Sequence, residues 1–332
     1  MKKEMKNRMS HVIEKLEEQK LLLSIGDIDL KKNYGTFLKI GIVSETIGFL
    51  INRNNEATEL TSENFQGSER LVVPAQKWRG PERSYLLSEL RKAGGIIPEE
   101  YSRNMVVKKI LLKNPSSLIF GDSSTGSGSE AAGMASRMFY DWSYSYEPLA
   151  RISVRYLHNT LSEEGTILHE ENGTTKSNAI YNVPYVRPGV KLIRYVSMEN
   201  SSREMLLLAL MAISGTTRYG ARTAILGDNI RNNIVSIGFS KQETPVSSYS
   251  TLMKAWSSDS YDPEKLVTEE MHNAYGEVLV GGEDLRTLMT EVNQLRRSPD
   301  QLRAMGLVLV NKMEDDWSVF WNKKSSGKTP TN

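Results

Sequence analysis

The residues from Gly215 to Phe239, GTTRYGARTAILGDNIRNNIVSIGF, constrain the fold more than any other part of this 332-residue chain. The apolar stretch MLLLALMAIS before them predicts a buried helix that begins at a capping box of Ser201 and Glu204 and ends at Gly215 as its left-handed cap. Two further glycines mark a turn, and the β-branched run IVSIGF then predicts a strand. The sequence therefore predicts a helix, a glycine-rich turn and a strand as one continuous unit.

The turn concentrates side chains that suit nucleic acid. It carries Arg218, Tyr219 and Arg222, and Arg231 follows as the strand begins. Guanidinium groups bind phosphate oxygens through paired hydrogen bonds, and an aromatic ring offers a face on which a base can stack. The alternative is a solvated basic loop, because arginines in a glycine-rich turn often contact only water.

A second basic segment, PAQKWRGPER, favours the nucleic-acid interpretation. We expect a helix to begin near Pro81, a residue suited to the first helical turn, so Lys77, Trp78, Arg79 and Arg83 should lie on the preceding loop and that first turn. A helix N-terminus attracts anions through its free N–H groups and its dipole. Cations placed there predict a phosphate-binding site.

Charge and composition exclude several classes of protein. The formal net charge is only +2, yet residues 70–113 hold ten basic and four acidic side chains, and residues 259–316 are acidic. Such a dipolar chain can bind a polyanion at one end and a basic partner or its own copy at the other.

With no cysteine, the chain forms no disulfide or thiolate zinc site, and we predict no metal and no cofactor. No apolar run is long enough for a membrane span, so we predict a cytoplasmic protein.

The order of elements predicts the fold class. The predicted elements come in this order: a strand from about Tyr34, the basic helix, a strand at Val106–Leu112, a long insertion, the apolar helix and a last strand. This is the order of an α+β, ferredoxin-like or RRM-like core with large insertions and C-terminal helices. The predicted parts are an N-terminal helical segment (1–33), an RRM-like RNA-binding core (34–258) with an inserted region at about 104–190, C-terminal helices packed on the core (259–324) and a disordered tail (325–332). Residues 151–189 predict a projecting hairpin or lid.

At this point the sequence resembles a known family. The segments QKWRGPER (76–83), NAIYNVPYVRPG (178–189) and TTRYGAR (216–222) are similar to those of the repeated backbone subunit of type I-D CRISPR effector complexes, a branch of the RAMP superfamily. The likeness extends over roughly residues 34–250. Relatives in this family carry a cysteine cluster in the central insertion that looks zinc-binding, whereas this insertion has none.

The resemblance implies a non-catalytic subunit of which several copies line up along one CRISPR RNA, together with other subunits of the complex, and hold the guide ready to pair with target DNA. Base pairing then reads the sequence, and the protein supplies cations and projecting loops. The residues implied to bind RNA come from both basic segments: Lys77, Trp78, Arg79, Arg83, Arg218, Tyr219, Arg222 and Arg231.

Two other functions stay open on the sequence. The first is a RAMP-family nuclease that cuts the target strand or a precursor RNA with metal-dependent chemistry, for which Asp27, Asp29, Asp122 and Asp141 are the candidate acids. The second is a free-standing RNA-binding protein that binds stoichiometrically and forms no filament.

Overall fold

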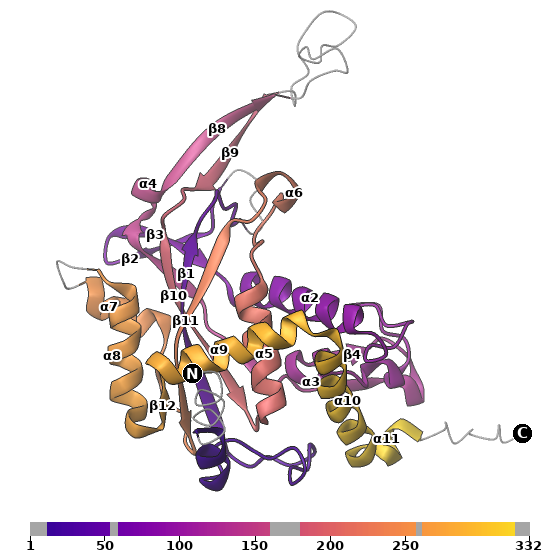
Figure 1. The fold of residues 1–332 in the computed structure, drawn as a ribbon. Coiled ribbons are helices and arrows are strands. Elements are labelled where there is room, and N and C mark those ends of the chain that lie inside the picture. The colour runs from indigo at the N-terminus through magenta and orange to yellow at the C-terminus, as the bar shows by residue number, and fades with distance from the viewer. Residues whose placement is uncertain (1–11, 54–58, 160–179, 257–260, 323–332) are drawn as a thin grey trace, which may run out of the picture.

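An antiparallel sheet of eight strands lies at the centre of the computed structural model, which describes residues 12–53, 59–159, 180–256 and 261–322 (Figure 1). In spatial order its strands are β12 (Leu279–Val280), β11 (Ile230–Ser240), β1 (Phe37–Thr46), β10 (Lys191–Glu199), β7 (Ser143–Pro148), β3 (Ser68–Val73) and β2 (Ser62–Phe65), and β6 (Met138–Tyr140) also pairs with β10. Strand β1 is central because eight of its ten residues are buried between two long partners.

The connectivity confirms the predicted α+β class with a ferredoxin-like core. Along the chain, β1, helix α2 (Ala75–Ala93), β6, β10, helix α5 (Arg203–Gly215) and β11 follow one another. In the sheet, β1 lies between β11 and β10, and β10 pairs with β6. This is the βαββαβ arrangement, with the last strand beside the first.

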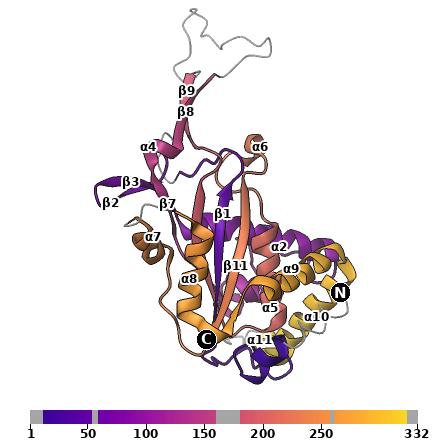
Figure 2. The same cartoon turned by 60° about the vertical axis from the view of Figure 1, so that its left-hand side comes forward.

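Helices cover both faces of the central strands (Figure 2). On one face α2 and α5 pack with α9 (Gly282–Arg297) and α10 (Pro299–Asp316) in the largest apolar cluster. On the other face α7 (Ser248–Trp256) and α8 (Pro263–Tyr275) cover Val43, Ile193 and Tyr195. Both faces of these central strands are therefore closed to a ligand by helices.

Two strand glycines allow the second helical layer to approach the sheet closely. A Cβ atom on Gly41 of β1 would lie 2.6 Å from Val267 Cγ1 of α8. A Cβ atom on Gly238 of β11 would lie 2.2 Å from Tyr275 Cγ. Both distances are below any normal contact, so the helix docks on bare backbone.

The insertions form two small sheets beside the core. The first contains 3-10 turns at Lys109–Leu112 and Gly128–Glu130, α3 (Pro115–Phe120), β4 (Asp122–Ser124) and β5 (Ala132–Met134). The second is a hairpin of β8 (Ser153–Asn159) and β9 (Ile180–Val186), which follows α4 (Leu149–Ile152) and projects away from the core (Figure 1). The predicted projecting hairpin is thus present, whereas β6 and β7, which lie within the predicted inserted region, belong to the main sheet.

Several predicted boundaries are wrong. Val106–Leu112 forms no strand: Val106 is buried, Val107 is exposed, and a 3-10 turn begins at Lys109. The cap of α5 is Ser202 rather than Ser201, since the Ser202 hydroxyl accepts from the Met205 N–H. Gly215 is the last residue of α5 rather than its left-handed cap, and its missing Cβ leaves room for the Tyr85 ring of α2.

Capping residues mark the C-terminal helices. Asp262 caps α8, Gly276 ends it, and the next two helices begin at Gly282 and Pro299. The short helices α6 (Thr223–Leu226), α7 and α11 (Ser318–Asn322) were not predicted. Of the predicted N-terminal segment, residues 12–18 are helical, while residues 1–11 and the tail 325–332 lie outside the described residues. Among the helices that the structure describes, none is long and apolar enough to span a membrane.

A buried ion pair joins the helices to the sheet. The Glu82 carboxylate of α2 lies 2.6 Å from the Arg194 guanidinium of β10, and both side chains are buried. Hydroxyls of Tyr140 and Tyr219 donate to the same carboxylate at 2.6 and 2.9 Å. Arg194 in turn donates to Ser44 of β1 and to Asn232 of β11. A single charged pair therefore links α2, the three central strands, β6 and the loop after α5.

We predict that Arg194→Met lowers the free energy of unfolding by about 3–5 kcal/mol, because it leaves the Glu82 carboxylate buried without its counter-charge. Urea denaturation followed by tryptophan fluorescence measures the change. The control is Arg218→Ala, which removes an exposed ion pair with Asp228 and should cost at most about 1 kcal/mol. Equal effects of the two substitutions would contradict the central role of the pair.

We also predict that Gly238→Ala lowers the free energy of unfolding by about 1–3 kcal/mol, since the added Cβ forces the Tyr275 ring out of its position. Gly133→Ala in β5 is the matched control, because no atom lies within 4 Å of its added Cβ. Thermal unfolding of both variants tests the prediction, and a Gly238→Ala protein as stable as Gly133→Ala would refute close helix docking.

Candidate nucleic-acid interface

The first basic segment is helical throughout, contrary to the prediction of a loop. Helix α2 begins at Ala75, so Lys77, Trp78, Arg79 and Arg83 lie within it, and Pro81 is inside the helix. The burial of Trp78 against Arg194 and Tyr219 explains why the helix starts two turns before the proline. Lys77 and Arg79 are half-buried, and Arg83 is buried.

The two aromatic rings expected to stack on bases lie in the protein core. Trp78 is 0 % exposed and Tyr219 is 2 % exposed, and their rings meet edge to face at 5.1 Å. The Arg194 guanidinium lies 4.5 Å from the Trp78 ring centroid. Burial, followed by the Glu82 carboxylate, raises the pKa of Tyr219 well above its usual value. Both rings are thus part of the core beneath the two basic segments, and the prediction that they stack on bases is wrong.

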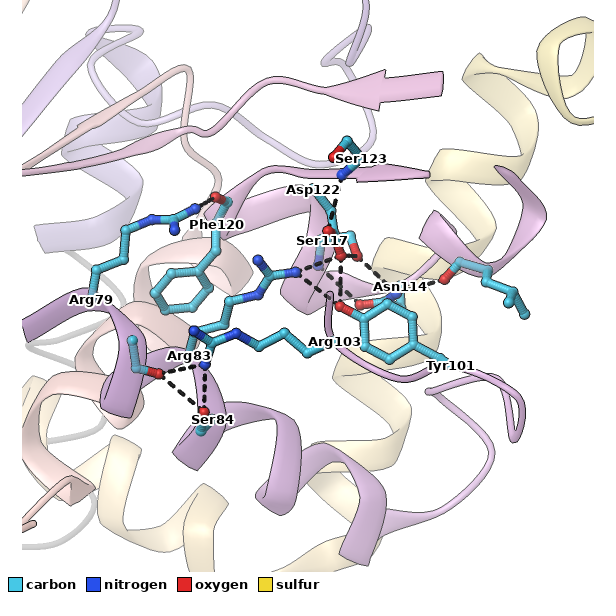
Figure 3. A network of polar contacts seen from close by, with 12 residues as sticks. Arg79, Arg83, Ser84, Tyr101, Arg103, Asn114, Ser117, Phe120, Asp122 and Ser123 are labelled. Atoms are coloured by element: carbon cyan, nitrogen blue, oxygen red, sulfur yellow. Dashed lines mark hydrogen bonds and ion pairs between the residues drawn. The ribbon is translucent and has the colours of Figure 1, made fainter. Parts of the chain in front are cut away.

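Arg83 is held inside a polar network rather than presented to a ligand (Figure 3). Its guanidinium pairs with Asp122 and donates to the Tyr101 hydroxyl at 2.8 Å. Tyr101 and Ser117 also donate to Asp122. Arg79, half-buried nearby, donates to the Phe120 carbonyl, and burial followed by the charge of Arg83 lowers its pKa. Arg83 thus fixes the insertion on α2, whereas Arg79 and Lys77 keep partial access to solvent.

The four acids considered for nuclease chemistry are scattered. Asp122 is neutralised by Arg83, Asp141 accepts from the backbone N–H groups of Trp142 and Ser248, and Asp29 pairs with two lysines. Asp27 is exposed. No group of three or more histidine, aspartate or glutamate side chains that could hold a metal ion occurs among the described residues.

Of the second basic segment, Arg218 and Arg222 lie on the loop between α5 and β11. Arg218 is exposed and lies 3.1 Å from Asp228, and Arg222 lies 5.1 Å from the centroid of the Tyr181 ring of β9. Arg231 lies on β11 and pairs with Glu45 at 2.6 Å, beside a cavity of about 310 Å³ that also contains Glu264 and Lys191. Exposed ion pairs are weak, so a phosphate can replace either carboxylate.

The loop and the projecting hairpin form one surface that is rich in cations. We define the hairpin–loop surface as residues 149–159, 180–191 and 215–227, which contain no aspartate or glutamate. Its cations are Arg151, Arg155, Arg187, Lys191, Arg218 and Arg222. Four of these six, all except Lys191 and Arg222, are exposed. These six cations outnumber the carboxylates at the edge of the surface, Asp228 beside Arg218 and Glu147 beside Arg151 and Arg187, so the surface attracts a polyanion.

The hairpin also offers aromatic rings to solvent. Tyr156 is 44 % exposed and Tyr181 is 37 % exposed. They lie on one face of the hairpin, where Tyr181 stacks with His158 at 5.7 Å and Tyr156 meets Phe49 edge to face at 5.6 Å. Exposed rings beside cations are the means by which proteins hold single-stranded nucleic acid without reading its sequence.

Backbone hydrogen bonds hold the hairpin and the loop together. Leu50 pairs with Val186 of β9, and the Ala221 N–H donates to the Ile51 carbonyl at 3.0 Å. A small apolar cluster around Ile51, Val183 and Tyr185 fills the space between them. The segment 49–51 therefore acts as a bridge that fixes the loop against the base of the hairpin.

The sequence prediction missed the cations and rings of the hairpin. Arg151, Arg155, Arg187, Tyr156 and Tyr181 lie in a stretch that was predicted to project over the RNA, but none of them was among the predicted RNA-binding residues. The absence of acidic residues in 149–159 and 180–191 was the available signal. What the sequence could not show is that this stretch lies beside the TTRYGAR loop.

Comparison with known proteins gives the family. The family described as Csc2 CRISPR matches residues 42–305. No curated protein matches the sequence. The fold is similar to the crystal structure of Thermofilum pendens Csc2, with a TM-score of 0.55 and 16% identity over 89% of this chain and 94% of that chain. A chain of a CRISPR RNA-guided surveillance complex in a pre-nicking state aligns with a TM-score of 0.47 and 12% identity over 74% of this chain and 90% of that chain. Because the family match covers most of its length, this chain belongs to the Csc2 CRISPR family.

Proposed function

We propose that this protein is the CRISPR RNA-binding backbone subunit of a type I-D interference complex in the cytoplasm. Copies of it assemble along the guide RNA with the other subunits and present the guide for pairing with target DNA. Membership of the Csc2 CRISPR family supports the proposal, and the cation-rich hairpin–loop surface is the single observation that carries it.

The chemistry of this surface fits a nucleic acid backbone rather than a specific base sequence. The surface combines six cations, of which four are exposed, with two exposed tyrosines. Guanidinium groups bind phosphates of any sequence, and tyrosine rings stack on any base. A subunit that holds a guide must bind every guide equally, so contacts of this kind are the ones it needs.

The hairpin is suited to reach beyond its own chain. It is a separate two-stranded sheet that projects from the core, and Leu157 at 62 % exposure is left uncovered on it (Figure 1). An isolated two-stranded hairpin is marginally stable in water, so a covering partner stabilises it. We propose that RNA and the neighbouring copy supply that cover.

The predicted residues then take different roles. Arg218 and Arg222 contact the RNA backbone with the hairpin cations, and Arg231, Lys77 and Arg79 are outlying contacts at half-buried or ion-paired positions. Arg83, Trp78 and Tyr219 support these contacts from the core. The role is non-catalytic in this proposal, and no arrangement of the described acids favours the nuclease alternative.

Charge reversal on the hairpin tests the RNA contact. We predict that the double substitution Arg155→Glu and Arg187→Glu lowers affinity for a labelled CRISPR RNA at least about tenfold. It should reduce the slope of log K against log salt concentration by about 1.4, because two phosphate contacts are lost. Fluorescence anisotropy at several salt concentrations measures both quantities.

The matched control for this experiment is Arg286→Glu, which changes an exposed arginine on α9, far from the hairpin in the fold (Figure 1). It should leave the affinity for CRISPR RNA, and the slope of log K against log salt concentration, close to those of the wild type. If the Arg286 variant loses as much affinity as the hairpin variant, binding follows net charge alone, and the hairpin–loop surface is not the interface.

Assembly is tested on the purified protein. We predict that it carries RNA, seen as a raised ratio of absorbance at 260 to 280 nm, and elutes as a large particle that falls apart after ribonuclease treatment. A protein that binds RNA as a monomer at every RNA length would favour a free-standing RNA-binding protein instead.

A further inference from the structure

The loop that carries Arg218 and Arg222 is held in one shape by buried groups that cannot touch a ligand. The Asn229 side chain accepts from the Tyr219 N–H at 3.0 Å and donates to the Tyr219 carbonyl at 2.9 Å. The N–H groups of Asn229 and Ile230 both donate to the Thr217 carbonyl. Between these anchors Gly220 has a φ of 81° and Arg222 a φ of 54°, so the backbone reverses sharply.

The Tyr219 hydroxyl ties this loop to the core. It donates to the Glu82 carboxylate of α2 at 2.9 Å and accepts from the Asn232 amide of β11 at 2.9 Å. The position of Gly220 is equally restricted, because a Cβ there would lie 2.4 Å from the Ile51 carbonyl oxygen. Arg218, which is exposed, and Arg222, which is half-buried, therefore lie on either side of a residue whose backbone and side chain are both fixed.

We infer that Tyr219 and Glu82 are positioning residues for RNA binding: they set the affinity of the loop arginines without touching RNA. This inference rests on the proposed RNA binding. A loop that is ordered before binding loses less conformational entropy when phosphates dock on it, so its arginines bind more tightly than the same arginines on a mobile loop.

The structure supplies an internal control for this role. Tyr140 of β6 donates its hydroxyl to the other oxygen of the same Glu82 carboxylate, at 2.6 Å. Tyr219→Phe and Tyr140→Phe therefore remove the same group from the same acceptor, but only the first belongs to the loop. A merely structural role of the network predicts equal effects of the two substitutions.

The experiment measures RNA affinity and its salt dependence for both variants in the full chain with a labelled CRISPR RNA. We expect Tyr219→Phe to weaken RNA binding about tenfold, because one or two loop residues then have to be ordered when RNA binds. The slope of log K against log salt concentration should not change, since the substitution removes no phosphate contact. Tyr140→Phe should bind as the wild type does. Arg218→Ala, which removes one phosphate contact, should reduce the slope of log K against log salt concentration by about 0.7.

Limited trypsin digestion provides a second readout, since trypsin cuts after Arg218 and Arg222. Cleavage there should be faster in Tyr219→Phe than in the wild type and unchanged in Tyr140→Phe. If Tyr219→Phe does not fold, Asn229→Ala carries the same test, because it removes the loop hydrogen bonds and leaves Glu82 untouched.

Two results would overturn the inference. One is an equal loss of RNA affinity in Tyr219→Phe and Tyr140→Phe, and the other is a wild-type RNA affinity in Tyr219→Phe. In either case, the proposed function still stands if Arg218→Ala binds RNA more weakly than the wild type. If Arg218→Ala and the hairpin charge reversal also bind RNA like the wild type, the proposed function fails first and the inference with it.

Discussion

The buried pair of Glu82 and Arg194 is the interaction on which the rest of the structure depends. Removing two charges from water costs several kcal/mol, and only close pairing with further hydrogen bonds offsets that cost. Here two tyrosine hydroxyls, Ser44 and Asn232 provide those bonds. Each donor or acceptor comes from a different element, so the pair stabilises one relative arrangement of α2, the sheet and the loop after α5.

This arrangement explains where the binding surface lies. Helices α7 and α8 close the sheet face opposite α2, and the glycines at 41 and 238 let α8 dock directly on the strands. We propose that RNA therefore binds at the end of the sheet, where the loop after α5 meets the base of the hairpin. The exposed side chains there include arginines and tyrosines, and Tyr219 and Glu82, which hold the loop, are buried in the same network.

The sequence predicted those elements whose signal lies within a few neighbouring residues of the chain, and it failed where the deciding contact comes from a distant part of the chain. The apolar helix before the glycine-rich turn, the strand over IVSIGF and the projecting hairpin follow from an apolar run, β-branching and loop length, and the structure has them as α5, part of β11 and the β8–β9 hairpin. The predicted start of α2 and the predicted exposure of the Trp78 and Tyr219 rings were wrong, because both rings pack in the core around Arg194, which lies more than 100 residues from Trp78 in the chain. The hairpin cations were missed because their partner, the TTRYGAR loop, is adjacent only in the fold.

The most direct test of the account is to map the RNA contacts by ultraviolet crosslinking of the assembled protein with a CRISPR RNA, followed by mass spectrometry of the crosslinked peptides. The account predicts crosslinks in residues 149–159, 180–191 and 215–227, with Tyr156 and Tyr181 as the aromatic sites. Crosslinks confined to α7 and α8, or to the outer face of α9, with none on the hairpin–loop surface, would contradict it.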